Sequence, residues 1–148
     1  ESDITINSDN IIISKVDNLK PTNIKTLVYP GFPTDIGQPM SVLLTQANGT
    51  SLFEETIWEN RMGHVPSLNK MGANITVKGM SSMTIGPSKL HGCEVVATDL
   101  RGGAALVLAG LTATGTTIVN DVEHILRGYE SIESKLTNVG AKIEIREI

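Results

Sequence analysis

The sequence of 148 residues lacks most of the features that mark membrane, secreted and nucleic-acid-binding proteins. Its single cysteine excludes an internal disulfide and is typical of a reducing, cytoplasmic compartment. No apolar run approaches the ~20 residues of a membrane span, so no membrane partner is expected. The net charge of −4 argues against a nucleic-acid partner. Only 3% of the residues are aromatic, so the core of this globular composition must be aliphatic.

What the sequence does contain is an internal repeat, in which five short motifs recur in the same order at offsets of 64 to 68 residues. The pairs are Thr34-Asp35 with Thr98-Asp99, Gly49-Thr50 with Gly115-Thr116, Arg61 with Arg127, Leu68 with Leu136, and Gly72-Ala73 with Gly140-Ala141. Such a period indicates a duplicated structural unit. We place one full unit at 34–97 and the last unit at 98–148. Residues 1–33 are then the end of a truncated unit, because 3–6 resembles the segments that close the later copies.

Hydrophobic periodicity predicts the elements of each unit. In the first unit we expect a helix over 36–47, a strand over 50–55, a helix over 65–71, a hairpin of 74–77 with 83–85, and a strand over 93–97. In the second unit we expect a buried helix over 100–113, a strand over 116–120, a helix over 128–139 and a strand over 142–145. The last of these helices should point Tyr129, Ile132, Leu136 and Val139 inward. The fold class is therefore α/β (α+β), with repeated β-α-β-α-β-β units whose helices share a core with the sheets outside.

Two aspartates, Asp35 and Asp99, each stand at the start of an expected helix. A carboxylate at that position commonly caps the free backbone N–H groups, and Gly49 would end the first helix. The alternative for Asp35 is a catalytic base, since the preceding Phe32-Pro33 pair stiffens its approach and could project it into a cleft.

Three arginines form the more unusual set. Arg61 and Arg127 occupy the same place in the two units, and Arg101 follows the second Thr-Asp pair at a helix start. Each could be an ordinary surface or ion-pair residue. Three of them in related positions suggest convergence on one anion, because the guanidinium fork grips carboxylate or phosphate through two hydrogen bonds.

Neither a metal site nor a cofactor site is expected from the remaining polar residues. The three histidines, His64, His91 and His124, lack metal-ligand spacing and are interpreted as surface or structural residues. Cys93 lies beside an apolar strand and is interpreted as a packed small residue. No glycine-rich phosphate loop is present. Residue patterns alone therefore predict a repeat domain with a possible anion site.

Four longer motifs carry a resemblance to a known family. They are Tyr-Pro-Gly-Phe-Pro-Thr-Asp at 29–35, Trp-Glu-Asn-Arg-Met-Gly-His-Val-Pro at 58–66, Ala-Thr-Asp-Leu-Arg at 97–101 and His-Ile-Leu-Arg-Gly-Tyr-Glu at 124–130. In order and spacing they closely resemble the UDP-N-acetylglucosamine 1-carboxyvinyltransferases, over essentially the whole chain. The resemblance implies an enolpyruvyl transferase-like fold, in which each domain is an inside-out α/β barrel of three units, here incomplete. It also implies enolpyruvyl transfer from phosphoenolpyruvate to the 3′-hydroxyl of UDP-N-acetylglucosamine, with loss of phosphate, in peptidoglycan synthesis.

The same resemblance implies roles for five residues. Asp35 matches the carboxylate that deprotonates the sugar hydroxyl, Ile57 matches a uridine-nucleotide contact, and Arg61, Arg101 and Arg127 match arginines that face phosphoenolpyruvate. The family's loop with a reactive cysteine has no counterpart in this chain, and Cys93 falls at a different place. The chain by itself is therefore expected to be inactive. It should need the N-terminal part of the same protein, or associate with itself through uncovered apolar faces. The alternatives are a non-catalytic module that binds a nucleotide sugar or an anion, and a purely structural repeat.

Overall fold

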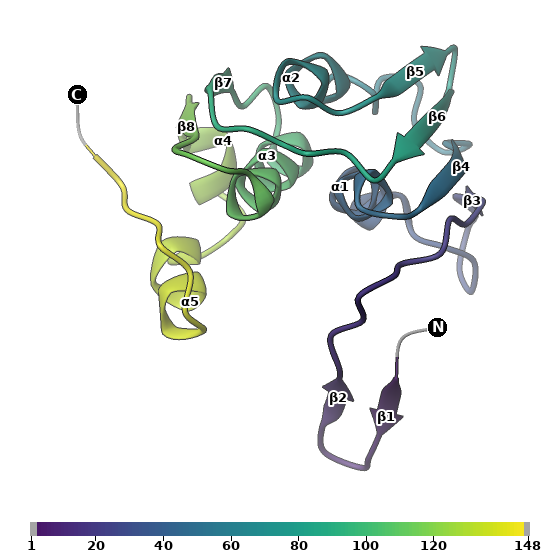
Figure 1. Ribbon diagram of the computed structural model, residues 1–148, viewed down its shortest axis with the longest axis horizontal. Coiled ribbons are helices and arrows are strands. Elements are labelled where there is room, and N and C mark those ends of the chain that lie inside the picture. The colour runs from purple at the N-terminus through teal and green to yellow at the C-terminus, as the bar shows by residue number, and fades with distance from the viewer. Residues whose placement is uncertain (1–2, 147–148) are drawn as a thin grey trace.

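The structure is a computed structural model that describes residues 3–146. Positions 1–2 and 147–148, at the outer ends of the first and last predicted units, lie outside the described residues. The chain starts with an antiparallel hairpin of β1 (Ile4–Ile6) and β2 (Ile11–Ile13), which stands apart from the rest in Figure 1. The strand expected at 3–6 is thus present, and it is paired as the strands of a closing hairpin would be.

The middle of the chain forms the expected β-α-β-α-β-β order. Its elements are β3 (Ile24–Lys25), the 3₁₀ turn η1 (Thr34–Ile36), α1 (Gly37–Thr45), β4 (Gly49–Glu54), α2 (Val65–Lys70), β5 (Ile75–Lys78) and β6 (Ser81–Gly86). The four strands make one sheet in the order β3-β4-β6-β5. The β3–β4 pair is parallel and the other two pairs are antiparallel, so the sheet is mixed. The predicted element order is confirmed here, whereas the unit boundaries remain a prediction.

The last part of the chain starts on the same plan. It contains β7 (Glu94–Val96), α3 (Leu100–Thr112), β8 (Ile118–Asn120), α4 (Glu123–Leu126) and α5 (Ile132–Asn138). The β7–β8 pair is parallel, like β3–β4. No helix within residues 3–146 is both long enough and apolar enough to cross a membrane.

Helices α1, α2 and α3 share one aliphatic core, as predicted. Val42 of α1, Leu68 of α2 and Leu106 of α3 are all buried in it, together with inward residues of β5 and β7. Small residues let α3 approach its neighbours closely, and a Cβ on Gly103 would lie 2.6 Å from Ile125 of α4. The helices therefore fix the relative position of the two parallel strand pairs, which matters for the site described below.

Several sequence predictions about the helices and strands differ from the structure. Gly49 does not end a helix: α1 stops at Thr45, and Gly49 opens β4 with a φ of 139°, which glycine adopts freely. The helix expected at 128–139 is shorter in the structure: α5 covers only Ile132–Asn138, and Ser131, at a φ of 47°, directly precedes it.

The residues of this region that were expected to point inward are not buried. None of the residues of α5, 132–138, is buried, and Val139 is 81% exposed. The strand expected at 142–145 is absent: these residues pair with no strand among residues 3–146.

The β1–β2 hairpin presents four isoleucines on one face. Cross-strand register places Ile4 opposite Ile13 and Ile6 opposite Ile11, and directly opposed residues share a face of a sheet. All four are more than half exposed, between 55% and 75%. Such a patch favours self-association, because burying it removes apolar area from water.

We expect the 148-residue chain to associate with increasing concentration, as measured by sedimentation velocity. Ile6→Lys should weaken the association by about tenfold, since one buried isoleucine is worth roughly the 1.4 kcal/mol that this factor requires. Thr5→Lys, on the opposite face of the same strand, is the matched control and should change it little. A chain that is monomeric at every concentration would contradict this prediction.

Candidate functional site

The carboxyl ends of the two parallel strand pairs lead into the segments that hold the candidate residues. After β3 and β4 the chain continues into residues 26–36 and 55–64, and after β7 and β8 into 97–99 and 121–131. Ligands bind preferentially outside the carboxyl ends of parallel strands. Because α1 packs against α3, the segments from the two units meet.

Asp35 lies at this junction, between two arginines. Its Oδ1 accepts a hydrogen bond from Nη2 of Arg61 at 3.2 Å, and its Oδ2 accepts one from Nη2 of Arg101 at 3.0 Å. The hydrogen bond from Arg101 lowers the pKa of Asp35 below its usual value. Partial burial opposes this effect, and the charges of Arg101 and Arg61 reinforce it. The side chain is about half exposed, so the ionised carboxylate is open to a ligand.

The two matching aspartates have different roles. Asp99 is the N-cap of α3, and its Oδ1 accepts hydrogen bonds from the backbone N–H groups of Arg101 at 3.0 Å and Gly102 at 2.8 Å. Among the described residues, neither η1 nor α1 has a side-chain cap, so the capping interpretation is wrong for Asp35. The difference arises because α3 begins directly after Asp99, whereas a 3₁₀ turn separates Pro33 from α1.

Each of the two arginines also rests on an aromatic ring. The guanidinium carbon of Arg101 lies 5.7 Å from the ring centre of Tyr129, whose hydroxyl oxygen accepts a hydrogen bond from Arg101 Nη1 at 3.1 Å. The guanidinium carbon of Arg61 lies 5.7 Å from the ring centre of Trp58. Trp58, Asn60, Arg61 and Asp99 line a shallow depression of about 220 Å³ beside Asp35. These contacts orient both guanidinium groups and leave further N–H donors for an anion.

The other two candidate residues are placed less directly. Ile57 is 40% exposed and lies four residues before Arg61, on the same segment. Arg127 is exposed and directly follows α4. Within residues 3–146, Arg127 makes neither an ion pair nor a hydrogen bond with Asp35, Arg61 or Arg101. The structure thus brings together three of the five candidate residues, and the role of each remains a proposal.

Sequence reasoning missed Glu55, a carboxylate that is 2% exposed. Its Oε1 accepts hydrogen bonds from Thr26 Oγ1 at 2.8 Å and from the backbone N–H groups of Ile57 at 2.8 Å and Trp58 at 3.2 Å. Its Oε2 accepts a hydrogen bond from Thr34 Oγ1 at 2.8 Å. Burial raises the pKa of Glu55, but these hydrogen bonds outweigh burial and lower it overall. Strand alternation could have revealed this residue, since position 55 follows the buried Phe53 at the period of a strand.

His64 is a buried histidine on the segment that follows Arg61. It is 3% exposed, and its Nε2 lies 2.7 Å from Oγ of Ser41 on α1. The Ser41 hydroxyl already donates to the carbonyl oxygen of Gln38 at 2.6 Å, so it accepts from an Nε2–H of a neutral His64. His64 thereby ties the segment that carries Arg61 to α1. The structural interpretation holds for this histidine.

Cys93 is half-buried against the shared core, in agreement with its interpretation as a packed residue. In residues 3–146 there is no group of three or more histidine, cysteine, aspartate or glutamate side chains that could hold a metal ion.

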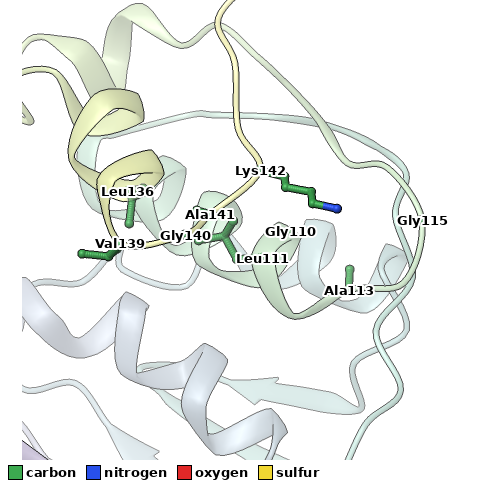
Figure 2. Close-up of a pocket in the computed structure, with 9 residues that line it drawn as sticks. All are labelled: Gly110, Leu111, Ala113, Gly115, Leu136, Val139, Gly140, Ala141 and Lys142. Atoms are coloured by element: carbon green, nitrogen blue, oxygen red, sulfur yellow. The ribbon is translucent and has the colours of Figure 1, made fainter.

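A separate hollow of about 570 Å³ lies between the end of α3 and α5 (Figure 2). Its nine lining residues include Leu111, Leu136 and Val139, and Lys142 is the one charged side chain among them. None of the five candidate residues lines this hollow, so it is distinct from the Asp35 cluster.

Comparison with known proteins gives a consistent result. The family model described as EPSP synthase (3-phosphoshikimate 1-carboxyvinyltransferase) matches residues 1–136. The chain is 54% identical over 140 residues to UDP-N-acetylglucosamine 1-carboxyvinyltransferase 2 of Shouchella clausii, which is 95% of this chain and 33% of that protein. It is 58% identical over 127 residues to UDP-N-acetylglucosamine 1-carboxyvinyltransferase of Halothermothrix orenii, which is 86% of this chain and 30% of that protein.

A solved structure supports the same assignment. The enolpyruvyl transferase NikO from Streptomyces tendae superposes with a TM-score of 0.89 at 27% identity, over 97% of this chain and 33% of that one. The chain therefore spans about a third of the length of the curated relatives that it matches. The expected fold class, α/β units of the enolpyruvyl transferase type in an incomplete domain, is confirmed. The chain belongs to the EPSP synthase (3-phosphoshikimate 1-carboxyvinyltransferase) family of enolpyruvyl transferases.

Proposed function

We propose that this chain forms one wall of the active site of a UDP-N-acetylglucosamine 1-carboxyvinyltransferase. The enzyme would move the enolpyruvyl group of phosphoenolpyruvate to the 3′-hydroxyl of UDP-N-acetylglucosamine, with release of phosphate, in cytoplasmic peptidoglycan synthesis. High identity to relatives of that name supports the substrate pair. The observation that carries the proposal is the carboxylate of Asp35 held between Arg61 and Arg101, where the two units meet.

Asp35 is the proposed base for the sugar hydroxyl. Its lowered pKa keeps it ionised at neutral pH, so it can accept a proton, but two paired arginines make it a weak base. Phosphoenolpyruvate offers a phosphate and a carboxylate, both of which a guanidinium grips through two hydrogen bonds. When these anions draw Arg61 and Arg101 away from Asp35, the carboxylate becomes more basic at the moment that both substrates are present.

Arg127 and Ile57 complete the proposed substrate contacts. Arg127 is exposed and two residues from Tyr129, so its charge is available to the same anion. The backbone N–H of Ile57 is already engaged by Glu55, which leaves its carbonyl oxygen and its exposed side chain to face the uridine nucleotide.

The test replaces the matching third of the Shouchella clausii relative with this chain, and we call the product the grafted protein. Phosphate release should require both phosphoenolpyruvate and UDP-N-acetylglucosamine, and the 148-residue chain alone should release none. A folded grafted protein that binds UDP-N-acetylglucosamine without releasing phosphate would instead support the alternative of a non-catalytic binding module.

A further inference from the structure

Glu55 connects the two segments that hold the proposed catalytic and binding residues. One of its donors, Thr34, directly precedes Asp35. Two others, the backbone N–H groups of Ile57 and Trp58, lie just before Arg61. The fourth, Thr26, is fully buried at the end of β3 and also accepts a hydrogen bond from the backbone N–H of Thr56 at 2.8 Å. One carboxylate therefore fixes the spacing between residues 34–35 and 57–58.

The matching position in the last unit shows that the repeat does not require this carboxylate. The offset of 66 residues that relates Arg61 to Arg127 relates Glu55 to Asp121. Asp121 is exposed and has a left-handed backbone with a φ of 56°. The counterpart of Thr26 is the apolar Ala97, because the N–H of Thr26 donates to the carbonyl oxygen of Glu54 at 2.9 Å, and that of Ala97 donates to the carbonyl oxygen of Asn120 at 3.0 Å. The network around Glu55 thus occurs in the unit that supplies Asp35 and Ile57.

We propose that Glu55 is a positioning residue for the reaction. It sets the distance between the Asp35 carboxylate and the 57–61 segment, and it does so without touching substrate, because its oxygens point inward to four donors. The expected effect of Glu55 on turnover rests on the proposed function. Its effect on the position of the 57–61 segment does not depend on that function.

The geometry suggests variants that separate the two connections. Thr34→Val removes only the hydrogen bond to the Asp35 side, and Glu55→Ala removes all four. Glu55→Gln is the conservative variant. Its amide oxygen can keep the three contacts of Oε1, and the Thr34 hydroxyl can turn to accept a hydrogen bond from its amide N–H. Asp121→Asn is the matched control at the equivalent position.

In the grafted protein, turnover and KM should respond differently to these variants. A misplacement of about 1 Å can cost about 10²-fold, so we expect Glu55→Ala to lower kcat/KM by about that factor. Thr34→Val should lower kcat by about tenfold and leave KM for UDP-N-acetylglucosamine within about twofold, because the Ile57 connection survives. On the same argument, the kcat/KM of Glu55→Gln should stay within about threefold of the parent value, and that of Asp121→Asn should equal it.

Trp58 provides a readout without turnover, since it is the one tryptophan of the sequence. In the 148-residue chain, Glu55→Ala should lower the fluorescence anisotropy of Trp58 by freeing its backbone N–H, and Asp121→Asn should not. Glu55→Asp, which is one methylene shorter, replaces Glu55→Ala if that variant does not fold.

The outcomes for Glu55 and for the proposed function can be told apart. Unchanged Trp58 anisotropy in a folded Glu55→Ala or Glu55→Asp chain would overturn the positioning role. Parental kcat and KM in folded Thr34→Val and Glu55→Ala grafted proteins would overturn it as well. If the grafted protein releases no phosphate, the proposed function fails, and the anisotropy still decides the role of Glu55.

Discussion

Replacing Asp35 with asparagine in the grafted protein should lower turnover by about 10²–10⁴-fold, the range that a general base contributes. Asparagine keeps the size of the side chain but accepts no proton. It also leaves Arg61 and Arg101 without their ion-pair partner, so KM for phosphoenolpyruvate should not rise. KM for UDP-N-acetylglucosamine should change only modestly, because the segment that carries Ile57 is held by Glu55 rather than by Asp35.

Steady-state phosphate release at varied concentrations of each substrate measures this effect. Asp121→Asn makes the same chemical change at an exposed aspartate outside the cluster and should retain full turnover. Near-normal turnover in Asp35→Asn would remove Asp35 as the base. The residue would then be a structural link between two arginines.

Elements with a buried apolar stripe could be predicted from the sequence because local pattern and packing agree there. The group Val65, Leu68 and Met71 faces the shared core. The stripe in 36–47 is buried only in part: Leu44 and Ala47 are 2% exposed, whereas Ile36 and Leu43 are 48% and 46% exposed. The small residues of α3 indicated close packing, and Gly103 meets Ile125. The same kind of stripe did not predict burial in 128–139, where no element among the described residues covers Leu136 and Val139. Periodicity identifies a face that can be buried, but another element must supply the burial.

The candidate site could be predicted only in part, for a related reason. Thr34-Asp35 and Thr98-Asp99 are identical dipeptides before a helix, and local propensity gives both the same role. They differ because α3 starts at once after Asp99, while a 3₁₀ turn follows Pro33 and frees the Asp35 carboxylate. The pairing of Asp35 with Arg101 spans 66 residues and depends on how α1 packs on α3, which no local pattern encodes.

Lowering the pH from 7 toward 4 should destabilise the chain through His64. Burial lowers the pKa of His64 from 6.5 to about 4, although the negative charge of Asp99 opposes the effect. Between these values the unfolded chain takes up a proton that the folded chain does not, so the stabilisation present above pH 6.5 is lost as the pH falls. The free energy of unfolding should drop by about 1.4 kcal/mol for each pH unit below 6.5, and by about 3 kcal/mol in total by pH 4.

Denaturant unfolding of the 148-residue chain at several pH values between 7 and 5 measures how the free energy of unfolding depends on pH. This window lies above the range where aspartates and glutamates begin to titrate. His64→Gln removes the titrating ring while its amide N–H can still donate to Ser41 Oγ, so this variant should show a much flatter dependence on pH. His91→Gln changes an exposed imidazole and serves as the control, which should keep the slope of the parent. An unaltered slope in His64→Gln would mean that other groups cause the acid sensitivity and that His64 can be protonated within the folded chain.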